Sequence, residues 1–226
     1  MSINRLAAIK LLDTLSRGLF VLVCTFQLPL EEAGRFGLFV TGIGLLSLAL
    51  AYERHIDMQR QVAGRTDFAI RKRIASLLRF FFSHYFIVLP IAIAAAALSG
   101  FSFTTIGIVL IIVIGEHLSL QAYLAALLTV RAFSLTVWVF IKNSLLLFLA
   151  LYYSWNNPST LNAGFILYLW CIVSLIYILI ATIWWWIWSD ESLLSTGDDL
   201  PSQSLTDQYK ASFLHFIMGL IAVLAL

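Results

Sequence analysis

The sequence predicts an all-α membrane protein, a polytopic bundle of six transmembrane helices followed by an incomplete seventh. Hydrophobic residues make up 61% of the 226 positions and charged residues 12%, whereas soluble domains contain about 45–50% and about 25%. The apolar residues also form uninterrupted stretches of about 20, the length of helix that crosses a hydrocarbon core roughly 30 Å thick. Length and composition together place the chain in a membrane.

Six stretches are long enough to span the membrane, namely residues 6–28, 34–52, 78–98, 104–127, 132–153 and 163–187. A seventh apolar run, 211–226, is 16 residues long and gives only about 24 Å of helix at ~1.5 Å per residue. Residues 189–210 hold five acidic side chains among Ser, Gly and Pro, which is typical of a polar linker. We therefore expect a transmembrane bundle in 1–188, a cytoplasmic linker in 189–210 and the start of a seventh helix in 211–226.

The basic residues orient these spans. The turns at 29–33, 99–103 and 154–162 hold no Lys or Arg, and Arg35 is the only basic residue close to that side. Because cytoplasmic loops carry the excess of Lys and Arg, we expect the amino terminus and the basic segments in the cytoplasm. The residues on that side are Arg5, Lys10, Arg54, Arg60, Arg65, Arg71, Lys72, Arg73, Arg131 and Lys210.

Charge and motifs remove several classes of function from the leading candidates. The formal net charge of +2 is too small to suggest a nucleic-acid surface. The chain has no Walker A, His-Glu-x-x-His, Gly-x-Ser-x-Gly or Cys-x-x-Cys pattern, so we expect no enzyme, no metal and no cofactor. Cys24 and Cys171 fall inside apolar spans and are expected to be buried thiols.

Charged residues inside the bilayer mark the candidate site, because each costs at least ~2.5 kcal/mol at a helix centre unless it faces a partner or a wet cavity. Asp13 and Arg17 in the first span are four residues apart, so they share one helix face and are able to pair. They either neutralise each other near the cytoplasmic end of the helix or face a cavity.

A second polar group lies in the fourth and fifth spans. Glu116 and His117 lie near the middle of the fourth, and Lys142 and Asn143 lie well inside the fifth. Counted from Arg131 in the turn, Glu116 is 15 residues back and Lys142 is 11 forward, which is roughly 22 and 16 Å of helix. An ion pair between Glu116 and Lys142 is therefore expected either to staple the two helices or to line a polar pathway suited to a proton or a phosphate group.

Four segments carry a resemblance to a known family. They are LLDTLSRGLF in the first span, LEEAGRFGLFVT in the first outer turn, LALAYERHIDMQRQ leaving the second span, and QAYLAALLTVRAFSL around the inner turn before the fifth. On these segments the chain resembles the bacterial polysaccharide flippases, the O-antigen and capsule exporters of the multidrug, oligosaccharidyl-lipid and polysaccharide exporter superfamily. The likeness covers most of the chain by the order of its spans.

The resemblance implies two six-helix bundles around a central cavity in a bacterial inner membrane, with this chain as the amino-terminal half and a fragment of the second. The implied transporter carries an oligosaccharide linked to a polyprenyl diphosphate across that membrane for surface polysaccharide biosynthesis, including lipopolysaccharide. Its expected partners are this lipid-linked oligosaccharide, membrane lipids and either the carboxy-terminal half or other polysaccharide assembly proteins, with no nucleic acid. The substrate-binding residues expected here are Arg17, Lys142, Asp13, Glu116 and Asn143.

Within this group the cations would offset the loss of water from the diphosphate, and Arg17 and Lys142 are the best placed. Asp13 and Glu116 would neutralise them or couple the cycle to an ion. A cation-coupled drug exporter of the same superfamily stays open, although the mixed charges favour an anionic substrate. An integral membrane enzyme of envelope glycolipid synthesis would need reactive residues on larger outer loops than these. A non-catalytic partner subunit is the remaining alternative.

Overall fold

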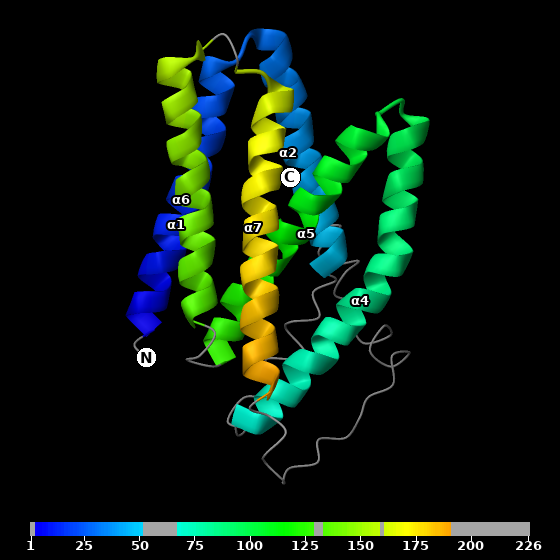
Figure 1. Cartoon of the computed structure of the whole chain (residues 1–226), viewed down its shortest axis with the longest axis vertical. Helices are drawn as coiled ribbons and strands as arrows, with labels where there is room; N and C mark the ends of the chain where they lie inside the picture. Colours follow the sequence, from blue (N-terminus) through cyan, green and yellow to red (C-terminus); the bar gives the residue numbers. More distant parts are fainter. Residues whose placement is uncertain (1–2, 52–66, 129–132, 159–160, 191–226) are drawn as a thin grey trace, which may run out of the picture.

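The computed structural model describes the backbone of residues 3–51, 67–128, 133–158 and 161–190 (Figure 1). The helices in this part of the chain are α1 (Ile3–Gln27), α2 (Leu30–Ala51), α4 (Asp67–Leu98), α5 (Phe103–Leu128), α6 (Phe133–Asn156) and α7 (Ala163–Asp190). Each expected span falls on one of them, so the all-α prediction is confirmed. The expected seventh helix in 211–226, and the expected linker beyond its first two residues, lie outside the described residues.

Four of the described helices are long and apolar enough to cross a membrane, over Phe80–Leu98, Phe103–Leu127, Phe133–Asn156 and Ala163–Ile187. At 25 and 22 residues, α1 and α2 have a sufficient length. However, four charged residues lie in α1, and three lie in the first six residues of α2. The structure therefore supports a multi-pass membrane protein, while the count of six spans and a seventh is not confirmed.

Two apolar clusters at different levels hold the helices together. In both, α1 packs beside α6, and α5 packs beside α7. The first, which we call the Trp170 cluster, has the ring of Phe20 edge-on to Trp170, 5.5 Å between centroids. It also contains Ile112 and Leu146 among its buried residues. The second, the Tyr177 cluster, contains Leu6, Tyr123, Val139 and Tyr177. The helices α1, α5, α6 and α7 each contribute to both clusters. Between the two clusters, these four helices carry a layer of polar residues.

Small residues bring α5 and α7 into close contact. A Cβ atom built on Gly115 would lie 2.9 Å from Cβ of Ser174, closer than side-chain carbons approach in real structures. Small residues at such crossings let helix backbones approach in membranes, where lipid tails remove most of the hydrophobic driving force. Gly115 is one residue before Glu116, so this contact also fixes the height of that carboxylate against α7.

The helix α4 begins at Asp67, 11 residues before the expected start of the span at residue 78. Its basic opening is compatible with a helix, since Lys and Arg are good helix formers. The helix contacts α2 and α5, contains Pro90 in its interior and changes direction along its length (Figure 1). An interior proline is one of the few causes of a kink in a helix.

A glycine ends α4. The amide of Gly100 donates to the carbonyl of Ala97 at 3.0 Å, and the amide of Phe101 donates to that of Ala96 at 3.2 Å. This pair of bonds is the Schellman arrangement, which needs a left-handed residue after the helix. Gly100 supplies it with φ of 83°. The turn places Phe101 against Phe39 of α2, with 5.9 Å between ring centroids.

Candidate functional site

The polar layer between the two apolar clusters is the candidate site. Its residues come from α1, α5, α6 and α7, and each of the five residues expected from the sequence lies in it. Glu116 is at its centre, because groups on three other helices converge on its carboxylate. The polar residues that the structure brings together are Asp13, Ser16, Arg17, Glu116, Ser119, Lys142, Asn143, Ser144 and Trp170.

Glu116 accepts hydrogen bonds from two side chains and forms an ion pair with a third. The Nζ atom of Lys142 lies 2.7 Å from Oε1, and the indole nitrogen of Trp170 donates to the same oxygen at 3.0 Å. The Nη1 atom of Arg17 lies 3.3 Å from Oε2. A buried carboxylate needs such partners, because an unpaired charge in an apolar interior is costly. The expected Glu116–Lys142 ion pair is therefore confirmed, and it ties α5 to α6.

Lys142 is held on several sides. Besides Glu116, its Nζ atom donates to Oγ of Ser119 at 2.9 Å and lies 5.4 Å from the centroid of the Tyr177 ring. Ser119 in turn donates to the carbonyl of Gly115 at 2.7 Å. An ammonium group has three donors and no acceptor, so these contacts use most of its capacity. With 2% of its side chain exposed, Lys142 is buried inside the bundle.

A second set of polar contacts joins α1 to α6. The amide nitrogen of Asn143 donates to Oδ1 of Asp13 at 2.5 Å, and the hydroxyls of Ser16 and Ser144 lie 3.3 Å apart. Asp13 is buried, and its partner is on another helix. Of the two alternatives left open for Asp13 and Arg17, the described contacts do not show mutual neutralisation, because Asn143 of α6 and Glu116 of α5 partner them across the bundle.

Arg17 differs from the other charged members because 44% of its side chain is exposed. The guanidinium has five N–H donors, and its ion pair in the described part of the chain is the one with Glu116. Lys10 lies seven residues before it on the same face of α1 and is also exposed, with Nζ 3.9 Å from the centroid of the Tyr123 ring. The two cations form an accessible stripe beside the buried layer.

Sequence reasoning missed Lys10, Trp170 and three serines, Ser16, Ser119 and Ser144. A Trp near the middle of an apolar stretch carries no signal of its own, and Ser residues are common at helix contacts in membranes. Lys10 had a signal in its spacing of seven from Arg17, which places both on one face. Two histidines make other contacts: His84 contacts the carbonyl of Ala49, and His117, the residue after Glu116, contacts Tyr85 and Gln121.

The arrangement provides anion attraction and no evident covalent chemistry. Two carboxylates, Asp13 and Glu116, face three cations, Lys10, Arg17 and Lys142, so the group carries one net positive charge. No group of His, Cys, Asp and Glu in the described residues has the geometry of a metal site. Cys24 and Cys171 are buried free thiols, as expected. The accessible positive charge lies on α1.

The fold and the site together define an all-α protein with membrane-crossing helices and a buried, ion-paired polar layer. No protein-family model matches the chain, and neither a curated protein nor a solved structure does. The resemblance to polysaccharide flippases therefore stands on the sequence segments that carry it.

Proposed function

We propose that the protein is a transporter that moves an oligosaccharide linked to a polyprenyl diphosphate across a bacterial inner membrane. The single observation that carries the proposal is the half-exposed Arg17 beside a polar layer in which the other charges are buried. In the proposed topology all six described helices cross the membrane, and the amino terminus is cytoplasmic. The charges of α1 and α2 then face polar partners or the membrane boundary.

A diphosphate fits this site better than a neutral or cationic group. Its oxygens must leave water to pass through the membrane, and a guanidinium replaces the lost hydrogen bonds in a planar, bidentate geometry. Lys10, about 10 Å farther along α1 at ~1.5 Å per residue, adds a second positive charge on the same face. These two residues are the proposed contacts of the headgroup.

Glu116 gives Arg17 an alternative partner. When Arg17 turns toward a phosphate, the Glu116 carboxylate keeps its bonds from Lys142 and Trp170, so it is not left as an unpaired buried charge. The exchange therefore costs less than the rupture of an isolated buried pair. In this scheme Lys142, Asp13 and Asn143 hold the layer together, and Arg17 alternates between Glu116 and the substrate.

The alternative of a cation-coupled drug exporter receives less support from this geometry. A cationic drug needs an accessible carboxylate, but Asp13 is buried against Asn143 and Glu116 is enclosed by three donors. The exposed charge of the site is positive.

A binding measurement tests the proposal directly. The purified full chain, kept in detergent, is titrated with undecaprenyl diphosphate and with undecaprenol, and bound lipid is counted by native mass spectrometry. We expect preference for the diphosphate, and we expect Arg17→Gln to lower that preference about tenfold, since a charged hydrogen bond contributes about 1.5–3 kcal/mol. Arg5→Gln on the same helix is the matched control and should bind as the unaltered protein does. Equal binding of the two lipids would overturn the proposal.

A further inference from the structure

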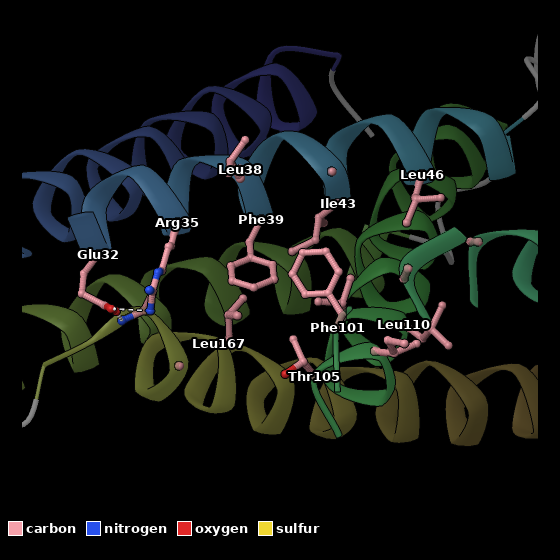
Figure 2. A pocket seen from close by; sticks show the side chains of 17 residues that line it. Glu32, Arg35, Leu38, Phe39, Ile43, Leu46, Phe101, Thr105, Leu110 and Leu167 are labelled. Atoms are coloured by element: carbon pink, nitrogen blue, oxygen red, sulfur yellow. Dashed lines mark hydrogen bonds and ion pairs between the residues drawn. The ribbon is translucent and has the colours of Figure 1, made fainter. Parts of the chain in front are cut away.

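A cavity lies away from the polar layer, between α2, α4, α5 and α7 (Figure 2). Its volume is about 590 Å³, within the range of small-molecule sites. Of the 17 described residues that line it, Glu32, Arg35 and Thr105 have polar side chains. The cavity is therefore an apolar groove with charge at one end.

The groove has a charged end and an apolar end. Figure 2 shows Glu32 and Arg35 at one end, Phe39 and Ile43 along its length, and Leu46 at the other end. From Arg35 to Leu46 the helix α2 advances 11 residues, about 16 Å at ~1.5 Å per residue. One leaflet of a hydrocarbon core about 30 Å thick measures roughly 15 Å. The groove thus matches the depth of a single leaflet.

The groove is open on one side and unsuited to water. Leu38, on its rim, is 76% exposed and Phe101 is 48% exposed, so the apolar lining continues onto the surface that faces lipid in a membrane. Water in a cavity needs two to four polar partners per molecule, and below the charged end Thr105 has the one polar side chain among the described lining residues. A hydrocarbon chain from the bilayer fills such a space without loss of hydrogen bonds.

The charged end fits a headgroup that carries both signs. Arg35 donates from Nη2 to Glu31 at 2.8 Å and from Nη1 to Glu32 at 3.2 Å, which leaves three of its five N–H donors for a further acceptor. Glu32 is fixed, because its other oxygen accepts from the amide of Ala163 at 2.9 Å. Glu31 is 79% exposed. One cation flanked by two carboxylates complements a phosphate joined to an ammonium group, and it opposes a purely anionic headgroup.

We propose that this groove holds one acyl chain of an amine-bearing phospholipid, with its phosphate at Arg35 and its ammonium group at Glu31. The site is separate from the polar layer and does not depend on the proposed transport function. A bound lipid would fill the opening between α2 and α4, which contact each other and α5.

Two glycines of α2 provide a matched test. Gly42 lines the groove, and Gly44 does not. A Cβ atom at either would meet nothing within 4 Å, so both accept a side chain. Gly42→Leu should fill the groove and lower retention of phosphatidylethanolamine about tenfold, whereas Gly44→Leu should retain it as the unaltered chain does. Retained lipid on the purified full chain is counted by native mass spectrometry after extraction from mixed phosphatidylethanolamine and phosphatidylglycerol vesicles.

A separate experiment tests the assignment of the headgroup. Arg35→Gln should abolish the preference for phosphatidylethanolamine over diacylglycerol while the groove still admits a chain. Phosphatidylethanolamine with a photoreactive acyl chain should label peptides from 38–46 and 101–110. Preference for phosphatidylglycerol would overturn the zwitterionic headgroup, and equal retention by Gly42→Leu and Gly44→Leu would overturn the groove as the site. Appearance of a dimer in place of bound lipid would assign the groove to a second copy and overturn the proposal.

Discussion

The ammonium nitrogen of Lys142 lies 2.7 Å from Oε1 of Glu116, and the side chains of the two residues are 2% and 4% exposed. Removal of one charge from such a pair leaves the other buried with too few partners. We expect Lys142→Met to lower the free energy of unfolding by about 3–5 kcal/mol, measured by thermal unfolding in detergent. Because a neutral replacement of both partners is often tolerated, Lys142→Met with Glu116→Gln should recover most of this loss. A single variant as stable as the unaltered protein would contradict the structural role.

A variant in which Glu116 and Lys142 exchange their charges should be less stable in the membrane than the unaltered chain. In Glu116→Lys with Lys142→Glu, the new ammonium group at 116 would face the Arg17 guanidinium and the N–H donor of Trp170, where the structure now places a carboxylate. We expect membrane abundance below that of the unaltered chain, measured by immunoblot of isolated membranes. Adding Arg17→Gln should recover part of the loss by removal of the repulsion. Full recovery by the exchange alone would mean that Arg17 and Trp170 contribute little.

The crossing of α5 and α7 predicts a strong effect of one methyl group. Gly115→Ala would place a carbon 2.9 Å from Cβ of Ser174, and overpacking of this kind costs about 1–3 kcal/mol. Gly107→Ala on the same helix meets nothing within 4 Å and should be neutral or stabilising. Ser174→Gly should rescue Gly115→Ala in thermal unfolding. Equal melting temperatures for the two alanine variants would show that α5 and α7 separate at no cost.

The backbone conformation predicts that substitution by alanine lowers stability at one glycine and raises it at another. Gly100 has φ of 83°, so Gly100→Ala should destabilise the protein by about 1 kcal/mol. Gly37 lies inside α2 with open space around a Cβ atom, and Gly37→Ala should stabilise it by about 0.5–1 kcal/mol. Both changes are measured by thermal unfolding. Stabilisation by Gly100→Ala would be incompatible with the turn that ends α4.

The proposed orientation predicts which engineered thiols react from outside. Cys24 and Cys171 are buried, so they should give little background with an impermeant maleimide. In intact cells Asn157→Cys should be labelled, and Gly64→Cys should be labelled only after the membrane is opened. The reverse pattern would place the amino terminus on the outer side.

Much of the polar layer was predictable because helix rise converts residue spacing into depth. The distances of Glu116 and Lys142 from Arg131 placed them at similar levels, and the ion pair followed. For Asp13 and Arg17 the spacing of four left two alternatives open, because it shows that two residues share a face and says nothing of the neighbouring helix. Asn143 and Glu116, which take those partners, are far away in sequence.

The limits of the fold prediction have a similar origin. Hydropathy located all six described helices, but it placed the start of α4 near its first apolar residues, whereas backbone hydrogen bonding continues through the basic segment to Asp67. Four of the described helices are apolar enough to be counted as spans by composition alone, whereas α1 and α2 contain several charged residues. The phospholipid groove had no sequence signal, because its lining combines residues of four helices that are each unremarkable in composition.

The close crossing at Gly115 divides the molecule into parts with different freedom to move. Two helices that meet without room for a methyl group cannot slide along each other unless they first separate, so α5 and α7 should travel as one body. Any change in the width of the polar layer must then come from α1 and α6, which Asp13 and Asn143 join to each other. The contacts of Glu116 with Arg17 and with Lys142 both span the boundary between these two bodies, so the bodies part only when both contacts are broken.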